Sequence, residues 1–195
     1  MERNSLHSQG YKLESQIREA FGRITYSQTC HDKNAQRLLK TNENVKLFQI
    51  ILSAISSGGI VTAVITSQQI AGIIAAITSF LLLVFNAYSK NFNLVETAQE
   101  HQKAADLLWK VREEYVSLLT DFEMLSDKDI MKKRDELQER THEIYCTTLR
   151  TDRKSYLEAQ KSLQTEEEQT FSEQEIDIML PNSIRRKNRN SKSKE

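Results

Sequence analysis

Residues 47–89 read LFQIILSAISSGGIVTAVITSQQIAGIIAAITSFLLLVFNAYS and contain no Asp, Glu, Lys, Arg or His. Charged residues make up 28% of the whole chain, so a gap of this length needs a physical cause. A helix rises about 1.5 Å per residue, and roughly 20 apolar residues cross the ~30 Å hydrocarbon core of a bilayer. The stretch therefore holds two spans, 47–65 and 70–88, joined by a polar turn at 66–69. The sequence predicts a helical hairpin in a membrane.

The composition predicts an all-α protein. One Pro and five Gly in 195 residues favour long helices with few turns. β-branched residues concentrate in the spans, where lipid imposes helix because each backbone group must be satisfied within its own segment. We expect a membrane hairpin of two transmembrane helices, continued by long cytoplasmic helices packed as a stalk and followed by a disordered C-terminal tail.

The flanks of the hairpin divide the rest of the chain. Residues 1–10 are expected to be disordered, 11–44 to form an N-terminal cytoplasmic helix that breaks or bends near 41–44, and 45–89 to form the hairpin. Residues 90–164 are expected to form C-terminal cytoplasmic helices, with the best amphipathic stripe over 91–122. A second helix over 128–163 has a sparser stripe and is expected to be peripheral. Residues 165–195 run from acidic to basic and are expected to be mostly disordered.

A hairpin brings its two flanking helices together as antiparallel neighbours. The apolar positions before the first span recur every three or four residues, as do those after the second. We expect the two stripes to pack against each other in the stalk, each side chain contributing roughly 1.5 to 3 kcal/mol on burial. The residues expected to meet are Leu13, Ile17, Phe21 and Ile24 from the first helix and Leu108, Tyr115, Leu119 and Phe122 from the second.

Basic residues near the span ends indicate the orientation. Four of them between 33 and 46 precede the first span, Lys90 and Lys103 follow the second, and the turn carries no charge. The positive-inside rule then places both termini in the cytoplasm and the turn outside. We expect a multi-pass protein of the cell's inner, cytoplasmic membrane.

Hydroxyl, amide and small side chains inside the spans admit two interpretations. They pack the helices closely, with hydroxyls bonding across the interface for about 1 kcal/mol each, or they form a water-accessible face in an oligomer and line a pore. The two are compatible if hairpins assemble in a ring. No ionisable residue lies in the spans, which argues against a proton relay or coupled transport. The candidate residues are Gln49, Ser53, Ser56, Ser57, Gly58, Gly59, Ala75, Ser79 and Asn86.

Signs of catalysis are missing from the sequence. It contains no phosphate loop, nucleotide-binding glycine turn, nucleophile elbow or carboxylate pair, so we expect no enzyme activity and no cofactor. Adjacent Cys30 and His31 have poor spacing for zinc, and nothing in the sequence brings them together with His142 and Cys146, so we expect no metal site and surface or partly packed residues. The basic residues after 184 could attract anionic lipid or nucleic acid, or simply solubilise the tail, and we expect no direct nucleic-acid partner.

The arrangement resembles the SLATT domains, the two-transmembrane effectors associated with nucleotide-sensing modules in prokaryotic conflict systems. A polar helix with Arg23–Tyr26 leads to the hairpin, and the helix AQEHQKAADLLWKVREEYVSLLTDF follows the exit at Lys90. The similarity covers about 11–165. The scattered matching positions are His101, Ala105, Leu108, Trp109, Arg112, Tyr115, Leu118 and Leu119.

The resemblance implies a membrane effector that a separate sensor triggers to perforate or depolarise the membrane during phage infection. The sensor would be a nucleotide-signal synthase or of reverse-transcriptase type. Since one hairpin encloses no channel, we expect a homo-oligomer in the lipid bilayer. The resemblance implies that this oligomer acts in antiviral defence by abortive infection. The alternative is a non-toxic membrane anchor or scaffold that recruits a cytoplasmic partner. A soluble helical protein is disfavoured because the rest of the chain offers too little apolar surface to cover the hairpin.

Overall fold

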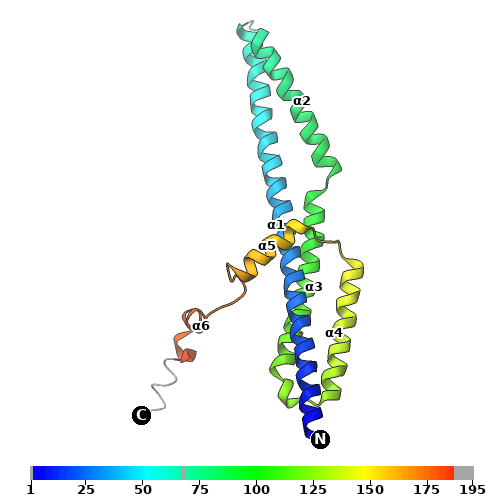
Figure 1. The fold of residues 1–195 in the computed structure, drawn as a ribbon. Helices are drawn as coiled ribbons and strands as arrows, with labels where there is room; N and C mark the ends of the chain where they lie inside the picture. Colours follow the sequence, from blue (N-terminus) through cyan, green and yellow to red (C-terminus); the bar gives the residue numbers. More distant parts are fainter. Residues whose placement is uncertain (1, 67–68, 187–195) are drawn as a thin grey trace.

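One uninterrupted helix, α1 (Glu2–Thr66), runs the length of the molecule. The computed structural model describes residues 2–66 and 69–186, and helices are the only regular elements in that part of the chain. Helix α2 (Gln69–Asn91) returns beside the upper part of α1, and α3 (Leu94–Thr120) continues down its lower part (Figure 1). The remaining elements are η1 (Phe122–Met124), α4 (Asp127–Thr147), α5 (Arg153–Gln164), α6 (Glu173–Met179) and η2 (Asn182–Ile184).

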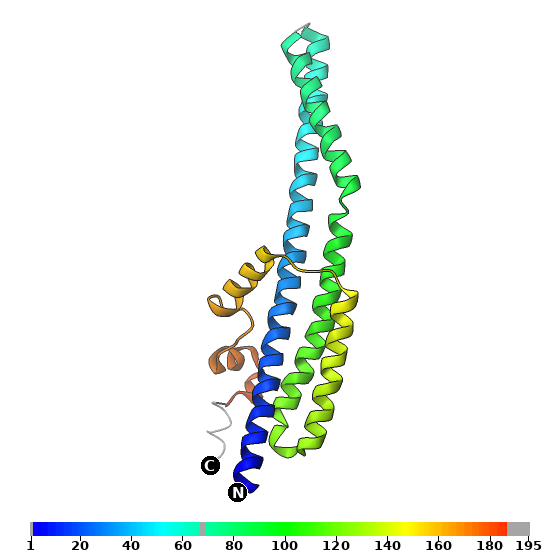
Figure 2. The ribbon, with the colours of Figure 1, turned by 45° about the vertical axis from the view of Figure 1, so that its right-hand side comes forward.

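The hairpin of α1 and α2 extends beyond every other element (Figures 1 and 2). The structure contains two helices long and apolar enough to cross a membrane, and they hold the predicted spans. Large apolar side chains along both are exposed, among them Val64 at 77% and Ile70 at 73%. A core helix of a soluble protein would bury such side chains. This apolar surface matches the hydrocarbon of a bilayer.

The helix boundaries differ from the prediction at the junction between hairpin and stalk. We expected a break near 41–44, but α1 continues through it, because this segment holds no Gly or Pro. The interruption lies on the other arm, where α2 ends at Asn91 and Asn93 caps α3 by accepting from the Glu96 amide. At this junction the side formed by α1 is therefore a continuous helix, and the side formed by α2 and α3 is interrupted.

The ends of the chain are more helical than predicted. Helix α1 begins at Glu2, within a segment expected to be disordered. The expected disordered tail contains α6, which has a capping box between Ser172 and Glu175. Residues 187–195, most of the basic tail, lie outside the described part, as do residues 67–68 of the turn.

A three-helix core holds the stalk together. The structure brings the eight predicted stalk residues into one cluster, in which Phe21, Leu119 and Phe122 are partly buried and the other five are buried. The prediction that 128–163 is one peripheral helix is wrong. Helix α4 contributes Ile130, Leu137 and Ile144 to the core, so a sparse stripe suffices when every residue in it is buried.

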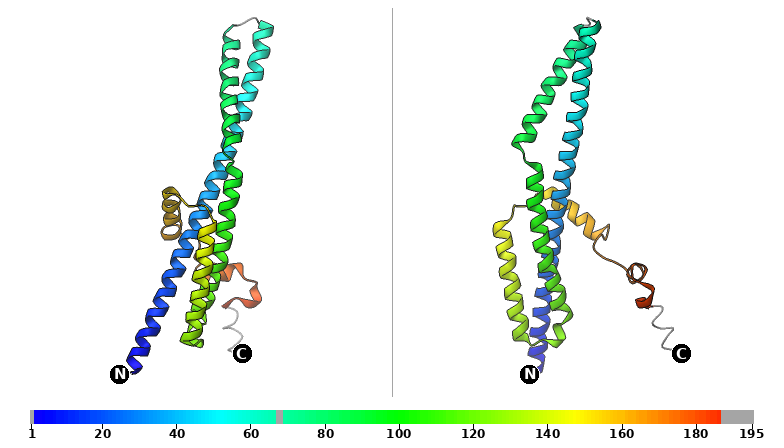
Figure 3. Two further views of the ribbon diagram at one scale, coloured as in Figure 1. Left: turned by 90° about the vertical axis from the view of Figure 1, so that its right-hand side faces the viewer. Right: turned by 180° about the vertical axis from the view of Figure 1, so that it is seen from behind.

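The helix predicted over 128–163 is divided at Thr148–Asp152. The hydroxyls of Thr147 and Thr148 bond back to the Glu143 and Ile144 carbonyls and end α4. Asp152 then caps α5 by accepting from the Ser155 amide. Helix α5 packs on α1 rather than continuing along α4 (Figure 3).

Candidate functional site

The closest approach of the two spans is built from small residues. A Cβ at Gly59 would lie 3.0 Å from the Ala75 Cβ and 3.3 Å from the Ala71 carbonyl oxygen. One turn earlier, the Ser56 and Ser79 hydroxyls are 2.5 Å apart, and Ser56 is buried. Glycine and serine thus let the backbones approach, as small residues do in membrane helix pairs.

A second polar contact joins the spans near the junction with the stalk. The Gln49 amide nitrogen donates to the Asn86 Oδ1 at 3.0 Å and to the Ser89 hydroxyl at 3.2 Å. The Phe48 and Phe85 rings stack beside it with centroids 6.3 Å apart. These contacts satisfy amide groups that would be costly to leave unpaired in lipid.

The predicted span residues therefore fall into two groups. Those that pair α1 with α2 are Gln49, Ser56, Gly59, Ala75, Ser79 and Asn86. Ser53, Ser57 and Gly58 are exposed, and a Cβ at Gly58 would meet nothing within 4 Å. The first group packs one hairpin, and the second leaves a strip of small and hydroxyl residues on its outer surface.

Below the membrane, a buried histidine pair joins α1 to α3. The Nδ1 atoms of His31 and His101 are 2.9 Å apart, although the residues are 70 positions apart in the chain. Both side chains are buried, and the His101 Nε2 is 3.0 Å from the Asn34 Nδ2. The pair lies in the stalk, where α3 packs against the continuous helix α1.

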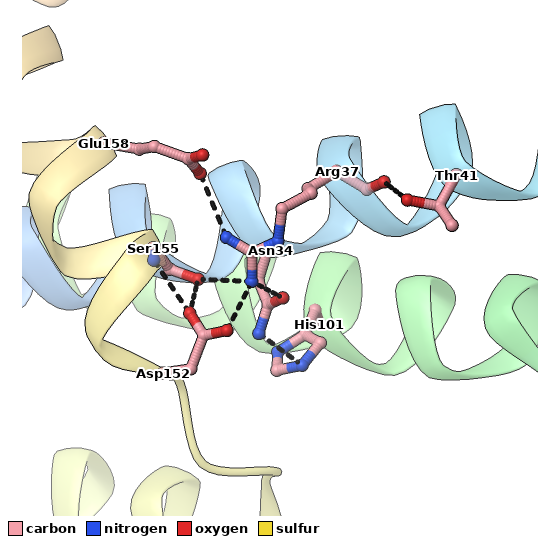
Figure 4. A network of polar contacts seen from close by, with 7 residues as sticks. All are labelled: Asn34, Arg37, Thr41, His101, Asp152, Ser155 and Glu158. Atoms are coloured by element: carbon pink, nitrogen blue, oxygen red, sulfur yellow. Dashed lines mark hydrogen bonds and ion pairs between the residues drawn. The ribbon is translucent and has the colours of Figure 1, made fainter. Parts of the chain in front are cut away.

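A chain of hydrogen bonds determines the tautomer of each histidine ring, and Figure 4 shows the part of it that runs from Arg37 through Asn34 to His101. The Arg37 Nη2 donates to the Asn34 Oδ1 at 2.8 Å, so the Asn34 Nδ2 faces His101 and donates to its Nε2. His101 must then carry its proton on Nδ1 and donate it to the His31 Nδ1. Adding a proton to either ring would place two donors face to face.

The pKa values follow from this environment. Burial, and to a smaller extent the neighbouring His101, lower the pKa of His31 to about 4. Burial also lowers the pKa of His101, with the Arg37 cation acting in the same direction and Asp152 and Glu100 opposing it. Burial and then Asp152 raise the pKa of the Cys30 thiol to about 11. At neutral pH the junction holds two neutral imidazoles and a protonated thiol.

Arg37 connects this junction to α5. Its guanidinium contacts the Asp152 carboxylate at 2.6 Å, Glu158 at 3.1 Å and the Ser155 hydroxyl at 3.3 Å (Figure 4). The pKa of Asp152 is strongly lowered, first by the Ser155 hydroxyl and also by Arg37. One cation therefore orients both Asn34 and the first turn of α5.

Sequence reasoning missed this network, although one signal was present. His31 and His101 stand on the buried stripes of α1 and α3, at the spacing of Ile24, Ala35 and Leu108. A polar residue on an apolar stripe indicates a buried polar contact. No cluster of three or more metal-binding side chains occurs among the described residues, and Cys30–His31 and His142/Cys146 lie on separate helices.

The comparisons with known proteins agree with the hairpin architecture. The family model described as SMODS and SLOG-associating 2TM effector domain family 4 matches residues 13–175. Comparison with curated proteins and with solved structures returns no match. The matched region contains both spans, the three-helix core and α5.

Proposed function

The chain belongs to the SMODS and SLOG-associating 2TM effector domain family, and from this membership we propose that it permeabilises the inner membrane by assembling hairpins into a pore. It is a two-transmembrane membrane effector of conflict systems. The proposed trigger is a separate sensor protein, and the proposed outcome is abortive infection that protects the surrounding population. It needs no catalytic chemistry of its own, and both of its termini face the cytoplasm.

The outer strip of the hairpin carries the argument for assembly. Ser53, Ser57 and Gly58 are exposed on α1 among large apolar residues. A hydroxyl that faces hydrocarbon gains no hydrogen bond from the lipid. Against another hairpin it can bond across the interface, and in a pore it can bond to water. Two helices enclose no channel, so self-association is required for conduction.

Membrane potential provides the direct test. Induced expression should collapse the signal of a potential-sensitive dye and slow growth. Replacing Ser53 and Ser57 with Leu should abolish depolarisation while leaving membrane insertion intact, because the outer strip becomes fully apolar. Ile77→Leu is the matched control, since Ile77 is exposed on α2 and stays apolar. An intact potential with the wild-type protein accumulated in the membrane under triggering conditions would refute the proposal.

The anchor alternative is distinguished by exchanging the hairpin. The stalk core includes no residue of the spans, so an unrelated two-helix hairpin should leave the stalk folded. An anchor would keep its activity after this exchange. Loss of depolarisation with a folded stalk would assign the activity to the hairpin itself.

A further inference from the structure

Helix α5 packs on α1 rather than along α4, the helix that comes immediately before it in the chain. The linker Thr148–Asp152 leaves α4 on one side of the stalk and reaches α5 on the other (Figure 2). Both ends of this linker have extended backbone conformations. We call residues 152–169 the arm. The surface that receives the arm is called the groove, and it consists of Tyr26, Thr29, Lys33 and Arg37 of α1 and Arg112 of α3.

The contacts between arm and groove are polar and ionic. The inward face of α5 consists of small residues, Ser155, Ala159 and Ser162, which are fully buried. Around them, Arg37 pairs with Asp152 and Glu158, and Lys33 pairs with Glu168 at 2.7 Å. The groove supplies the cations and the arm supplies the carboxylates.

The end of the arm is held in the same way. The Gln164 amide donates to the Tyr26 hydroxyl at 2.7 Å, and the Gln169 amide donates to the Thr29 hydroxyl at 2.9 Å. The Arg112 guanidinium of α3 donates to Oε1 of the Gln169 side chain. Because no residue of the arm belongs to the hydrophobic core cluster of the stalk, the arm can detach from the groove while that core stays packed.

Spanning a membrane places the grooves of neighbouring copies at one height. Copies inserted in the same orientation present their stalks side by side, so a neighbour's groove is displaced only laterally from a copy's own. Five extended residues reach up to about 17 Å, and packed helices are separated by about 8–10 Å. The linker is therefore long enough to carry α5 to an adjacent copy whose α1 packs directly against α4.

We propose that in the assembled effector the arm of each copy occupies the groove of the next copy. The inference rests on the proposed self-association. The same ion pairs and hydrogen bonds form within one chain and between chains, so the exchange creates no new type of contact. Each copy gives one arm and receives one, and this head-to-tail pattern closes on itself as a ring. The single chain with its arm in its own groove is then the unassembled form.

A photo-crosslinker in the arm tests the exchange directly. Tyr156 stacks on Tyr26 with ring centroids 5.8 Å apart, so p-benzoylphenylalanine at position 156 keeps an aromatic ring against α1. Full-length chains with this residue and one tag are co-expressed with wild-type chains carrying a second tag. After irradiation in membranes, we expect adducts joining the two tags, mapped by mass spectrometry to α1 near Tyr26.

A native gel run in parallel separates the possible failures. Assembled protein with adducts only within one chain overturns the exchange and leaves the pore proposal standing. Protein that is monomeric under depolarising conditions overturns both. Inter-chain adducts mapped to segments other than the groove also overturn the exchange, because they show proximity without occupancy.

Charge reversal gives a second test that does not depend on the photoreaction. One chain carries Lys33→Glu and Arg37→Glu in the groove, and another carries Glu158→Lys and Glu168→Lys in the arm. Each alone mismatches every groove with every arm, so α5 should lose protection from proteolysis. Co-expression restores complementary pairs only between chains, and we expect protection of α5 to rise several-fold. A mixture no better protected than its components, alongside protection in the chain carrying all four changes, would contradict the exchange.

Discussion

At the scale of single residues, the junction under the membrane depends on proton positions. Arg37 orients Asn34, Asn34 fixes the tautomer of His101, and His101 donates to His31. Each member accepts or donates in only one direction, so a change at one end alters the other. A buried network of this kind is stable only when every member is satisfied.

The histidine pair predicts a loss of stability in acid. Unfolded His31 takes up a proton below its ordinary pKa of 6.5, whereas the folded residue stays neutral down to about 4. The unfolded state then binds more protons, so the free energy of unfolding falls as pH drops from 6.5 to about 4, by up to about 3 kcal/mol. Thermal unfolding in detergent across this range should show it.

The control for that measurement is His31→Gln, which has no titrating group. Its unfolding temperature should vary less between pH 6.5 and 4 than that of the wild type. The carboxylates Asp152 and Glu168, whose pKa values are lowered, are common to both proteins and cancel in the comparison. Equal pH dependence in the two proteins would contradict the assigned role of the pair.

The two cysteines should differ sharply in reactivity. Cys146 is exposed, whereas Cys30 is buried and its thiol has a pKa raised to about 11. Since the thiolate is the reactive form, a maleimide at pH 7.5 should label Cys146 and spare Cys30. Peptide mass spectrometry reads out both sites, and denaturation should make both reactive. Comparable labelling rates in the folded protein would show that the junction is open.

At the scale of helices, one side of the hairpin is a continuous helix and the other side is interrupted. Helix α1 passes from the stalk into the membrane without interruption, while α2 and α3 are separated at Phe92–Asn93. Movement of the lower half of α1 is therefore transmitted to its span, and the joint lets α2 tilt relative to α3. The missing side chain at Gly59 lets the two spans approach this closely.

Adjacent glycines give a matched pair for testing that contact. Gly59→Val should force α2 away from α1, because even a Cβ would lie 3.0 Å from the Ala75 Cβ, and overpacking of this kind costs about 1–3 kcal/mol. Gly58→Val places the same side chain in open space. Thermal unfolding in detergent should show a transition several degrees lower for Gly59→Val than for Gly58→Val. A transition that is equal in the two variants would mean the spans do not pack as described.

At the scale of the whole molecule, the hairpin tip and the stalk occupy opposite ends. The start of α1 lies at the end of the stalk far from the tip, and α6 lies to the side of the stalk, also away from the tip (Figure 1). Exposed large apolar side chains follow one another along the whole hairpin, whereas elsewhere they are scattered. Among the described residues, the ion pairs lie in the stalk and in the segments that follow it. This division fits a protein half in lipid and half in water.

Labelling from one side of the membrane tests the orientation. In a background with both native cysteines changed to Ser, Lys12→Cys and Glu173→Cys should react with an impermeant maleimide only after the inner membrane is opened. Gln69→Cys, at the tip, should react in intact spheroplasts. Labelling of Lys12→Cys and Glu173→Cys from opposite sides would rule out an even number of crossings.

The sequence by itself determined the hairpin and the main pairing of the stalk. A charge-free run of this length has one low-energy environment, and a hairpin makes α1 and α3 antiparallel neighbours, so their stripes had to meet. These features depend on local composition and on spacing within one segment, and both can be seen in a single sequence.

Only the tertiary structure decided which polar residues work together. His31 meets His101 across 70 residues, and Arg37 meets Asp152 across 115. Helical periodicity places His31 and His101 on buried stripes, but it does not say which polar side chain will face which, because the partners come from segments far apart in the chain. For the same reason, the sequence grouped Ser53 with Ser56 as candidates for packing or pore lining, whereas packing of the spans buried Ser56 and left Ser53 exposed.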